Sequence, residues 1–329
     1  MEHRAIPSTR LRTSVLGLGC GPLGGLFDEL NEDQANAVVA AALEAGISYF
    51  DTAPLYGMGL SEHRLGAGLR RARDSAVISS KVGRLLRASA KPDSGMFRDA
   101  LPFDCSYDYS YDGVMRSVED SLQRMGVNRI DILYIHDVNR RWHGDAVEAR
   151  YREVMDGGYK ALEALRRSGD VAAIGVGMND PDMLARFAEA GDFDVFMLAG
   201  RYTLLDQSGL DGLFQTCQAR NVSVVAAGPF NSGILATGAR PGAKFFYADA
   251  PAEIIERTQR IETVCDAHGV PLAAAALQFP LRHPVVVSVA TGMVSPDEVS
   301  RNVAALEQPI PAAFWSDLHA AGLLHPLAP

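Results

Sequence analysis

Residues 171–198 read VAAIGVGMNDPDMLARFAEAGDFDVFML, and this stretch contains one complete strand–helix–strand unit. Its two apolar runs, Val171–Val176 and Val195–Leu198, are hydrophobic almost throughout, as expected for strands that are buried on both faces. Between them, Pro181 stands in the first turn of a helical pattern over Asp182–Ala190, and Gly191 follows its end. A strand, a helix and a second strand in this order are typical of a parallel β-sheet.

The same alternation extends along the whole chain, because six further apolar runs have the length and composition of buried strands. Helical patterns lie between most of the runs, and one of them, Ala35–Glu44, is preceded by two possible caps, Asn31 and Asp33. Eight strand–helix units without a linker or a break in composition favour one α/β domain over residues 1–329, a (β/α)8 TIM barrel, over a doubly wound open sheet. The six runs are Val15–Leu18, Ile47–Phe50, Val77–Ser80, Ile132–Ile135, Val222–Ala226 and Val285–Val289, and the other helical patterns are Tyr111–Met125, Tyr159–Arg167 and the segments that Pro271 and Pro296 open.

Three connections are too long to be simple turns: Gly83–Ser110, Asp137–Asp156 and Pro229–Ala250. Each of them follows a predicted strand. In a barrel such connections lie on the C-terminal face, where active sites are built. The sequence therefore predicts a site at this face, framed by long loops.

Composition excludes several classes of function. With 47% apolar and 22% charged residues the chain is globular, and a net charge of −9 argues against nucleic acid as a partner. The N-terminal residues 1–12 have no signal-peptide core and no apolar stretch could span a membrane, so we expect a cytoplasmic protein without a membrane partner, monomeric or a small homo-oligomer. The four cysteines are scattered, and neither HExxH nor GxSxG occurs, so we expect no metal site and no serine nucleophile.

A glycine motif near the N-terminus, Gly19–Gly24, fits the GxGxxG pattern of dinucleotide-binding folds. In those folds a helix begins inside the motif, and its N-terminus binds the pyrophosphate. Here Gly25–Asn31 still has the composition of a loop, and the helical pattern begins near Asp33. The motif is therefore interpreted as a flexible first loop at the barrel mouth.

Four polar residues stand at or just after three successive predicted strands: Asp51, Tyr56, Lys81 and His136. Strand ends converge at one mouth of a barrel, so these side chains are expected to share a pocket. A lysine cation lowers the pKa of a nearby tyrosine, and a carboxylate holds the lysine in place. Tyr56 is then the general acid–base and His136 orients the substrate oxygen. Each residue alone has an ordinary structural explanation, as a turn cap, a loop aromatic, a surface lysine or a core histidine.

Around these residues the sequence resembles the aldo-keto reductase superfamily over nearly its whole length. The resemblance implies a TIM barrel, a nicotinamide cofactor and a catalytic tetrad of Asp51, Tyr56, Lys81 and His136. The motifs that carry it are Leu16–Cys20, Phe50–Gly57, Ser61-Glu62, Ser80-Lys81, Arg116–Leu122, Asp131–His136, Gly175–Asn179, Gly228–Leu235 and Gly292–Asn302.

The resemblance also implies the cofactor contacts. Asn179 matches the residue that holds the nicotinamide carboxamide. The loop Gly228–Leu235 matches the segment that covers the pyrophosphate, and Gly292–Asn302 matches the segment around the adenosine. The implied contacts are Gly19, Cys20, Asp51, Asn179, Gly228, Phe230, Ser232, Gly233, Leu235, Gly292, Glu298 and Asn302.

The chain departs from the family pattern in its nicotinamide and adenosine contacts. Ala227 stands where many members have a tyrosine under the nicotinamide, and Ala199 stands where many have a glutamine. Arg201 lies on the same strand face as Ala199. Gly292 and Glu298 replace the basic residues that face the 2′-phosphate of NADP. Because a carboxylate repels a phosphate but accepts a ribose hydroxyl, we expect NAD, with NADP as the alternative. Glu298 is otherwise simply a carboxylate at a helix N-terminus.

For the substrate, the chain most resembles the sugar-oxidising branch of the family, the D-threo-aldose 1-dehydrogenases, also called L-fucose or L-galactose dehydrogenases. The resemblance implies oxidation of the anomeric carbon of an aldose to a lactone, with Tyr56, His136, Trp142 and Arg201 as substrate contacts. A pyridoxal 4-dehydrogenase and a general NADPH-dependent carbonyl reductase are the enzymatic alternatives. A cofactor-binding subunit or redox sensor without catalysis is the non-enzymatic one.

Overall fold

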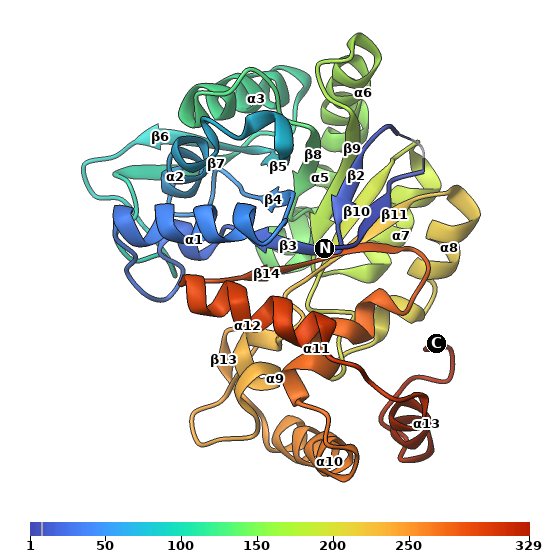
Figure 1. Cartoon of the computed structure of the whole chain (residues 1–329). Coiled ribbons are helices and arrows are strands. Elements are labelled where there is room, and N and C mark those ends of the chain that lie inside the picture. Colours follow the sequence, from blue (N-terminus) through green and yellow to red (C-terminus); the bar gives the residue numbers. More distant parts are fainter. Residues whose placement is uncertain (8) are drawn as a thin grey trace.

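A computed structural model describes residues 1–7 and 9–329, and its centre is a closed barrel of eight parallel strands surrounded by helices (Figure 1). The strands occur around the barrel in chain order, and the last pairs with the first through Val289–Gly292 and Leu16–Gly19. The fold is therefore the predicted (β/α)8 TIM barrel. Its strands are β3 (Leu16–Gly19), β4 (Tyr49–Asp51), β5 (Val77–Val82), β8 (Ile132–His136), β9 (Ala173–Met178), β10 (Val195–Ala199), β11 (Ser223–Ala227) and β14 (Val286–Gly292).

Every one of these strands corresponds to a predicted run, but each ends one to three residues later than the apolar pattern does. β4 includes Asp51, which pairs with Gly19 and Ser79, and β8 includes His136, which pairs with Gly177. A polar residue at the end of a buried strand still makes the backbone hydrogen bonds of the sheet, so the apolar run is shorter than the strand itself. The two side chains are thus fixed by the sheet itself.

Six of the helices that pack on the barrel correspond to predicted helical patterns, whereas the helices over residues 60–69 and 213–220 were not predicted. Asn31, rather than Asp33, caps α1 (Glu32–Glu44), because its side chain accepts a hydrogen bond from the backbone of Gln34 and the Gln34 side chain accepts one in return. Pro22–Gly24 forms only a short 3-10 turn, so no helix starts inside the glycine motif. The other helices packed on the barrel are α2 (Leu60–Leu69), α3 (Tyr111–Met125), α6 (Tyr159–Ser168), α7 (Pro181–Ala190), α8 (Leu213–Arg220), α11 (Leu272–Leu281) and α12 (Pro296–Glu307).

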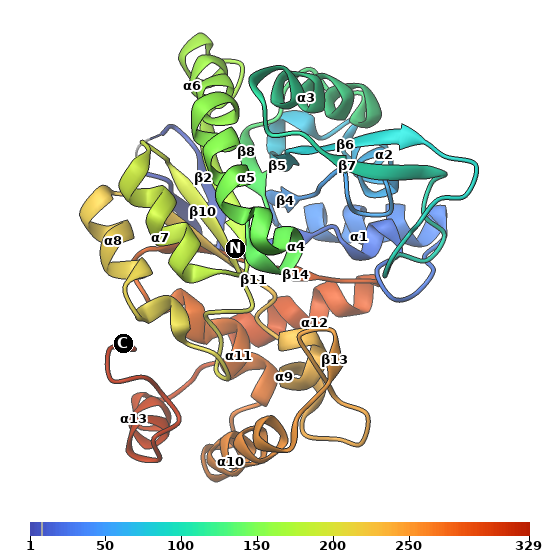
Figure 2. The ribbon, with the colours of Figure 1, turned by 180° about the vertical axis from the view of Figure 1, so that it is seen from behind.

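Two further helices, α10 (Ala252–His268) and α13 (Ala312–Ala320), pack on each other at the periphery of the molecule (Figures 1 and 2). Neither was predicted. Within the described ranges 1–7 and 9–329, no helix combines the length and the hydrophobicity that crossing a bilayer requires.

The N-terminal end of the barrel is closed by a hairpin that the sequence analysis did not predict, β1 (His3–Ala5) and β2 (Arg12–Ser14). Arg4 donates hydrogen bonds to the carbonyls of Leu281 and Val286, and Ile6 is fully buried with the side chains that fill the barrel interior. Three-residue strands carry too little periodicity to be recognised in a sequence. Because this end is closed, the site must form at the other end.

The three long connections follow the C-terminal ends of their strands, as predicted, and each contains secondary structure of its own. The first carries the hairpin of β6 (Arg84–Ala88) and β7 (Phe103–Tyr107). The second is helical, with α4 (Arg140–His143), α5 (Val147–Glu153) and a π-helical turn that leads into α6. The third carries a turn at Asn231–Gly233, α9 (Ile234–Thr237) and the hairpin of β12 (Lys244–Phe245) and β13 (Ala248–Asp249). These elements form the rim of the mouth.

We expect Gly175→Ala to lower the free energy of unfolding by about 3 kcal/mol, because overpacking against a fixed atom is costly. A Cβ at this position of β9 would lie 1.7 Å from the backbone oxygen of Val195 in the neighbouring strand, which cannot move without breaking the barrel ladder. Chemical denaturation measures the change. The matched control is Gly177→Ala in the same strand, where the nearest atoms are 3.5 Å away. Equal effects of the two substitutions would contradict this explanation.

Candidate active site

The four predicted catalytic side chains meet at the C-terminal mouth of the barrel. Asp51 ends β4, Lys81 lies in β5, His136 ends β8, and Tyr56 lies in the turn between β4 and α2. The Lys81 Nζ is 2.7 Å from Asp51 Oδ2 and 4.7 Å from the centroid of the Tyr56 ring. The rings of Tyr56 and His136 are 6.2 Å apart, edge to face. An acid, a phenol, an amine and an imidazole therefore surround one point.

Backbone geometry fixes the turn that carries Tyr56. Gly57, Met58 and Gly59 have positive φ angles of 63°, 52° and 95°. A Cβ at Gly57 would lie 2.4 Å from the backbone oxygen of Gly24, so only glycine allows the first βα loop to pack this closely on the turn. The two loops together hold Tyr56 at the mouth.

Asp51 and Lys81 form a buried ion pair with additional hydrogen bonds. Asp51 Oδ1 accepts a hydrogen bond from Ser79 at 2.7 Å, and Lys81 also donates to the backbone oxygen of Thr52 at 2.9 Å. Burial opposes the charge of Lys81, but Asp51 and Tyr56 outweigh it and raise the pKa of the lysine overall. Lys81 is therefore a fixed cation beside the phenol.

The pKa of Tyr56 is raised, whereas the sequence analysis predicts that the Lys81 cation lowers it. Burial raises the pKa of Tyr56 and Lys81 lowers it, and burial is the larger effect, so the net direction is upward. The prediction of a lowered pKa was wrong because it counted the neighbouring charge and ignored the desolvation of the phenolate. The neutral phenol is therefore the favoured form of Tyr56, which suits proton donation during reduction; during oxidation Tyr56 must first lose this proton to act as the base.

His136 is buried, and its backbone is fixed both by strand pairing in the barrel and by a hydrogen bond from a side chain. The Tyr109 hydroxyl donates a hydrogen bond of 2.7 Å to the His136 carbonyl oxygen. Burial, Arg84 and Lys81 all lower the pKa of His136 well below its usual value. Among the residues that the structure describes, no group bonds to the buried His136 Nδ1. A neutral imidazole carries one N–H, which is what an oxygen-orienting residue needs.

Because the pKa of His136 is lowered, we expect kcat/KM to show no inflection near ~6.5, the usual histidine value. The imidazole stays neutral until the pH falls well below that value, so no catalytic group changes charge there. A pH profile from about 5 to about 9 with saturating cofactor measures this. An inflection near ~6.5 that disappears in His136→Asn would contradict the neutral form.

Most of the predicted cofactor contacts lie around the same mouth. Gly19 ends β3, Gly292 ends β14, Asn179 follows β9 and Gly228 follows β11. Gly228 and Gly233 have positive φ angles of 65° and 103°, and no described atom lies within 4 Å of a Cβ built on Gly233. This open glycine-containing loop leaves room for a large ligand to approach the backbone, so the residues present fit a dinucleotide.

The remaining predicted contacts are placed less uniformly. Ser232 accepts a hydrogen bond from the backbone nitrogen of Tyr247, and Asn302 is half-buried on α12. Ser295 caps α12 by accepting a hydrogen bond from Glu298 N, and the Glu298 carboxylate in the first turn accepts one from Val294 N at 2.9 Å. Glu298 therefore has the structural role of a carboxylate in the first turn of a helix, in addition to the cofactor contact that is predicted for it. Cys20 and Leu235 are fully buried, and Phe230 is half-buried.

Two of the predicted substrate contacts, Arg201 and Trp142, interact with other groups of the protein. Arg201 donates to the backbone oxygen of Asn179 at 3.1 Å and to Asp206 at 2.7 Å, and it lies over the ring of Phe246. It therefore supports Asn179 and the β12–β13 hairpin. Trp142 is 38% exposed at the rim and packs on Arg84, with 4.6 Å between guanidinium and ring centroid.

The sequence analysis missed several residues that line the mouth. Arg84 and Asp137 form an ion pair beside His136, at 2.8 Å. Phe27 and Tyr247 come from different loops and their rings are 5.7 Å apart, while Phe97 lies 6.0 Å from Tyr56. Asp137 could have been found, since it directly follows a strand end. The aromatic residues lie inside long loops, where no periodic pattern marks them.

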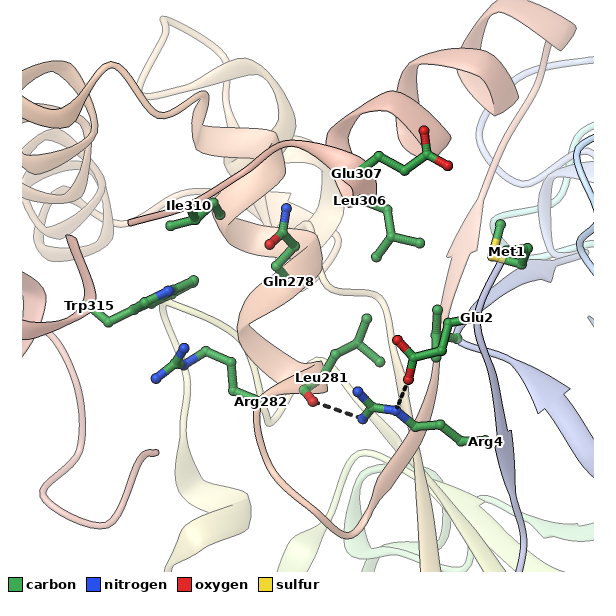
Figure 3. A pocket seen from close by; sticks show the side chains of 11 residues that line it. Met1, Glu2, Arg4, Gln278, Leu281, Arg282, Leu306, Glu307, Ile310 and Trp315 are labelled. Atoms are coloured by element: carbon green, nitrogen blue, oxygen red, sulfur yellow. Dashed lines mark hydrogen bonds and ion pairs between the residues drawn. The ribbon is translucent and has the colours of Figure 1, made fainter. Parts of the chain in front are cut away.

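A separate cavity of about 410 Å³ lies at the opposite, N-terminal end of the barrel, between the β1–β2 hairpin, α11 and α12 (Figure 3). Arg4, Gln278 and Trp315 are among its lining residues, and Arg4 bonds to Glu2 and to the Leu281 carbonyl. None of the tetrad reaches it. In TIM barrels the N-terminal face serves stability rather than catalysis.

Comparison with known proteins identifies the family of the chain. The model of the aldo/keto reductase family matches residues 15–322. The chain belongs to the aldo/keto reductase family. It is therefore an oxidoreductase that uses a nicotinamide cofactor, and the expectation of an enzyme rather than a non-catalytic cofactor-binding protein is confirmed.

The chain is similar to individual family members over almost its full length. It is 46% identical to pyridoxal 4-dehydrogenase from Microbacterium luteolum, with 98% of each chain covered. It is 40% identical to D-threo-aldose 1-dehydrogenase from a Pseudomonas species, with 97% of each covered. Among solved structures, the holo form of an aldo-keto reductase from Bacillus halodurans aligns with a TM-score of 0.78 and 26% identity, covering 99% of this chain and 97% of the other.

Proposed function

We propose that this enzyme oxidises a cyclic hemiacetal to the corresponding lactone, with NAD as the hydride acceptor. The observation that carries the proposal is the geometry around Tyr56, whose ring lies 4.7 Å from the Lys81 cation and beside the neutral imidazole of His136. Such a site binds one oxygen, holds its proton and leaves the attached carbon free to lose a hydride.

In the proposed reaction the hemiacetal carbon loses a hydride and its hydroxyl loses a proton, which leaves the lactone carbonyl. The nicotinamide, when bound, accepts the hydride. His136 donates its N–H to the reacting oxygen, and Tyr56, in its phenolate form, accepts the proton that the hydroxyl loses; in the reductive direction the neutral phenol returns that proton. Lys81 stabilises the phenolate form of Tyr56 electrostatically, and Asp51 keeps Lys81 charged and in place.

We place pyridoxal, which closes to an internal hemiacetal, first among the substrates. Phe27 and Tyr247, which are exposed, and Tyr56, which packs on the buried Phe97, give the mouth aromatic surfaces on which a flat ring can stack. The relative that is 46% identical is named for pyridoxal. Threo-configured aldoses such as L-fucose and L-galactose are the second candidate, because they present the same functional group and the relative that is 40% identical is named for them.

The preference for NAD rests on Gly292 and Glu298, which stand at the positions where NADP-dependent family members usually have basic residues. We expect Glu298→Arg to shift the ratio of kcat/KM for NADP over NAD at least about tenfold towards NADP, which corresponds to ~1.4 kcal/mol. Glu298→Gln is the control, because the amide oxygen can still accept the hydrogen bond from Val294 but carries no charge. A wild-type enzyme that already prefers NADP would overturn the cofactor assignment.

The experiment that tests the proposed function follows reduced-cofactor formation with NAD and with NADP. Pyridoxal, L-fucose, L-galactose and D-arabinose are compared with simple primary alcohols, and the product is identified as lactone or acid. Turnover of at least one hemiacetal substrate to its lactone, with little activity towards simple alcohols, is the expected result. Rapid reduction of simple carbonyls by NADPH, with no hemiacetal oxidised, would make the enzyme a general carbonyl reductase.

A further inference from the structure

The ion pair between Arg84 and Asp137 is more rigidly built than a surface salt bridge. The Arg84 side chain is 3% exposed, and its guanidinium carbon lies over two rings, 4.8 Å from the centroid of Tyr107 and 4.6 Å from that of Trp142. It donates to the Tyr107 hydroxyl at 3.1 Å and to Asp137 Oδ2 at 2.8 Å. A buried cation that contacts two aromatic rings and donates two hydrogen bonds has little freedom to move.

The backbone of Asp137 is fixed as firmly as its side chain. Its φ angle is 58°, in the left-handed region that few non-glycine residues adopt, and its backbone nitrogen donates to the Gly177 carbonyl at 3.0 Å. Strained backbone of this kind persists where the surrounding structure holds it, and it clusters at functional sites. The carboxylate is thus kept at one position beside the C-terminal end of β8.

This carboxylate faces the reacting position. Asp137 Oδ2 lies 3.3 Å from His136 Nε2, and the charges of Lys81 and Arg141 both act on Asp137, as Asp137 acts on Tyr247 across the mouth. Within residues 1–7 and 9–329, the hydrogen bond to this carboxylate comes from Arg84 and ends on Oδ2. The second oxygen, Oδ1, is therefore an acceptor without a protein donor.

We infer that Asp137, fixed by Arg84, binds a hydroxyl of the substrate that lies one or two carbons from the reacting carbon. This rests on the proposed function, in which His136 binds the reacting oxygen. In an aldose the hydroxyl is the one on the carbon next to the anomeric carbon. In pyridoxal it is the phenolic hydroxyl next to the ring carbon that bears the reacting group. A single acceptor at this position would serve either compound.

The test uses the reductive direction with NADH, so it does not depend on hemiacetal oxidation. Two matched pairs of aldehydes differ only in the neighbouring hydroxyl: lactaldehyde (2-hydroxypropanal) against propanal, and salicylaldehyde against benzaldehyde. Asp137→Asn is the variant, because asparagine tolerates the left-handed backbone and keeps the shape of the side chain. Asp145→Asn, at a fully exposed aspartate of the same loop, is the matched control.

We expect the wild-type enzyme to prefer the hydroxyl-bearing member of at least one pair in kcat/KM. Asp137→Asn should lower that preference about tenfold or more, since a site built around a substrate hydroxyl discriminates strongly against its absence. Arg84→Gln should lower it in the same direction, and Arg84→Lys should lose less of it. The control Asp145→Asn should leave the preference unchanged.

A residue that only supports the fold would lower both members of a pair equally, so an unchanged preference in soluble Asp137→Asn would overturn the inference. If Asp137→Asn does not fold, Arg84→Gln provides the same comparison of ratios. Failure of the proposed function has a different signature, since then no hemiacetal is oxidised while the aldehyde pairs still report on Asp137.

Discussion

Replacing Tyr56 by phenylalanine is expected to lower kcat by about 10²–10⁴-fold, the usual contribution of a general acid–base group. The substitution removes only the hydroxyl that exchanges the proton of the reacting oxygen. The ring, its packing on Phe97 and the buried pair of Asp51 and Lys81 all remain. Steady-state kinetics and cofactor titration by fluorescence measure the effect, and we expect cofactor binding to change little.

The matched control for this prediction is Tyr134→Phe. Tyr134 is fully buried in the barrel interior, where its hydroxyl bonds to that of Tyr49 at 3.3 Å. It loses the same atom as Tyr56→Phe but lies below the mouth, so activity should stay within a few-fold. A Tyr56→Phe enzyme whose kcat is within tenfold of the wild type would mean that another group transfers the proton.

Lys81→Met is expected to damage both stability and activity. It leaves the Asp51 carboxylate buried without its cation, which costs about 3–5 kcal/mol of unfolding free energy when one partner of a buried pair is removed. It also removes the positive charge beside Tyr56, so kcat should fall by about 10²-fold or more. Denaturation curves and kinetics on the soluble enzyme measure the two effects separately.

The double variant Asp51→Asn with Lys81→Met distinguishes the two roles of the lysine. It removes both charges, so most of the lost stability should return. Activity should remain low, because the phenolate of Tyr56 still has no cation near it. Recovery of activity together with stability would show that Lys81 is required only for folding, and the electrostatic role proposed for it would be wrong.

Predicting the barrel from the sequence succeeded because its strands are buried on both faces. Runs such as Ile132–Ile135 and Val195–Leu198 are continuous and apolar, and glycines or prolines mark the helices between them. The strand ends were wrong by a few residues, since Asp51 and His136 belong to the sheet although they are polar. The short hairpins at both ends of the barrel carry too few residues for a pattern.

The site was predictable only where a residue is tied to a strand end. Asp51, Lys81 and His136 satisfy this condition, and Tyr56 follows closely. Arg84 was missed because its ion pair with Asp137 joins positions that are 53 residues apart. The direction of the Tyr56 pKa was wrong because desolvation depends on burial, which a sequence does not display. The role of Glu298 in cofactor choice remains a prediction, and its carboxylate also accepts a hydrogen bond from Val294 N.

The central claim is that a hydride leaves the hemiacetal carbon. The most direct measurement uses pyridoxal and L-fucose that carry deuterium on that carbon alone, with NAD and the wild-type enzyme, followed by mass spectrometry of the reduced cofactor and the product. The account predicts one deuterium in the reduced cofactor and an unlabelled lactone from at least one of the two substrates. Reduced cofactor without deuterium, together with an oxidised product that keeps the label, would contradict it.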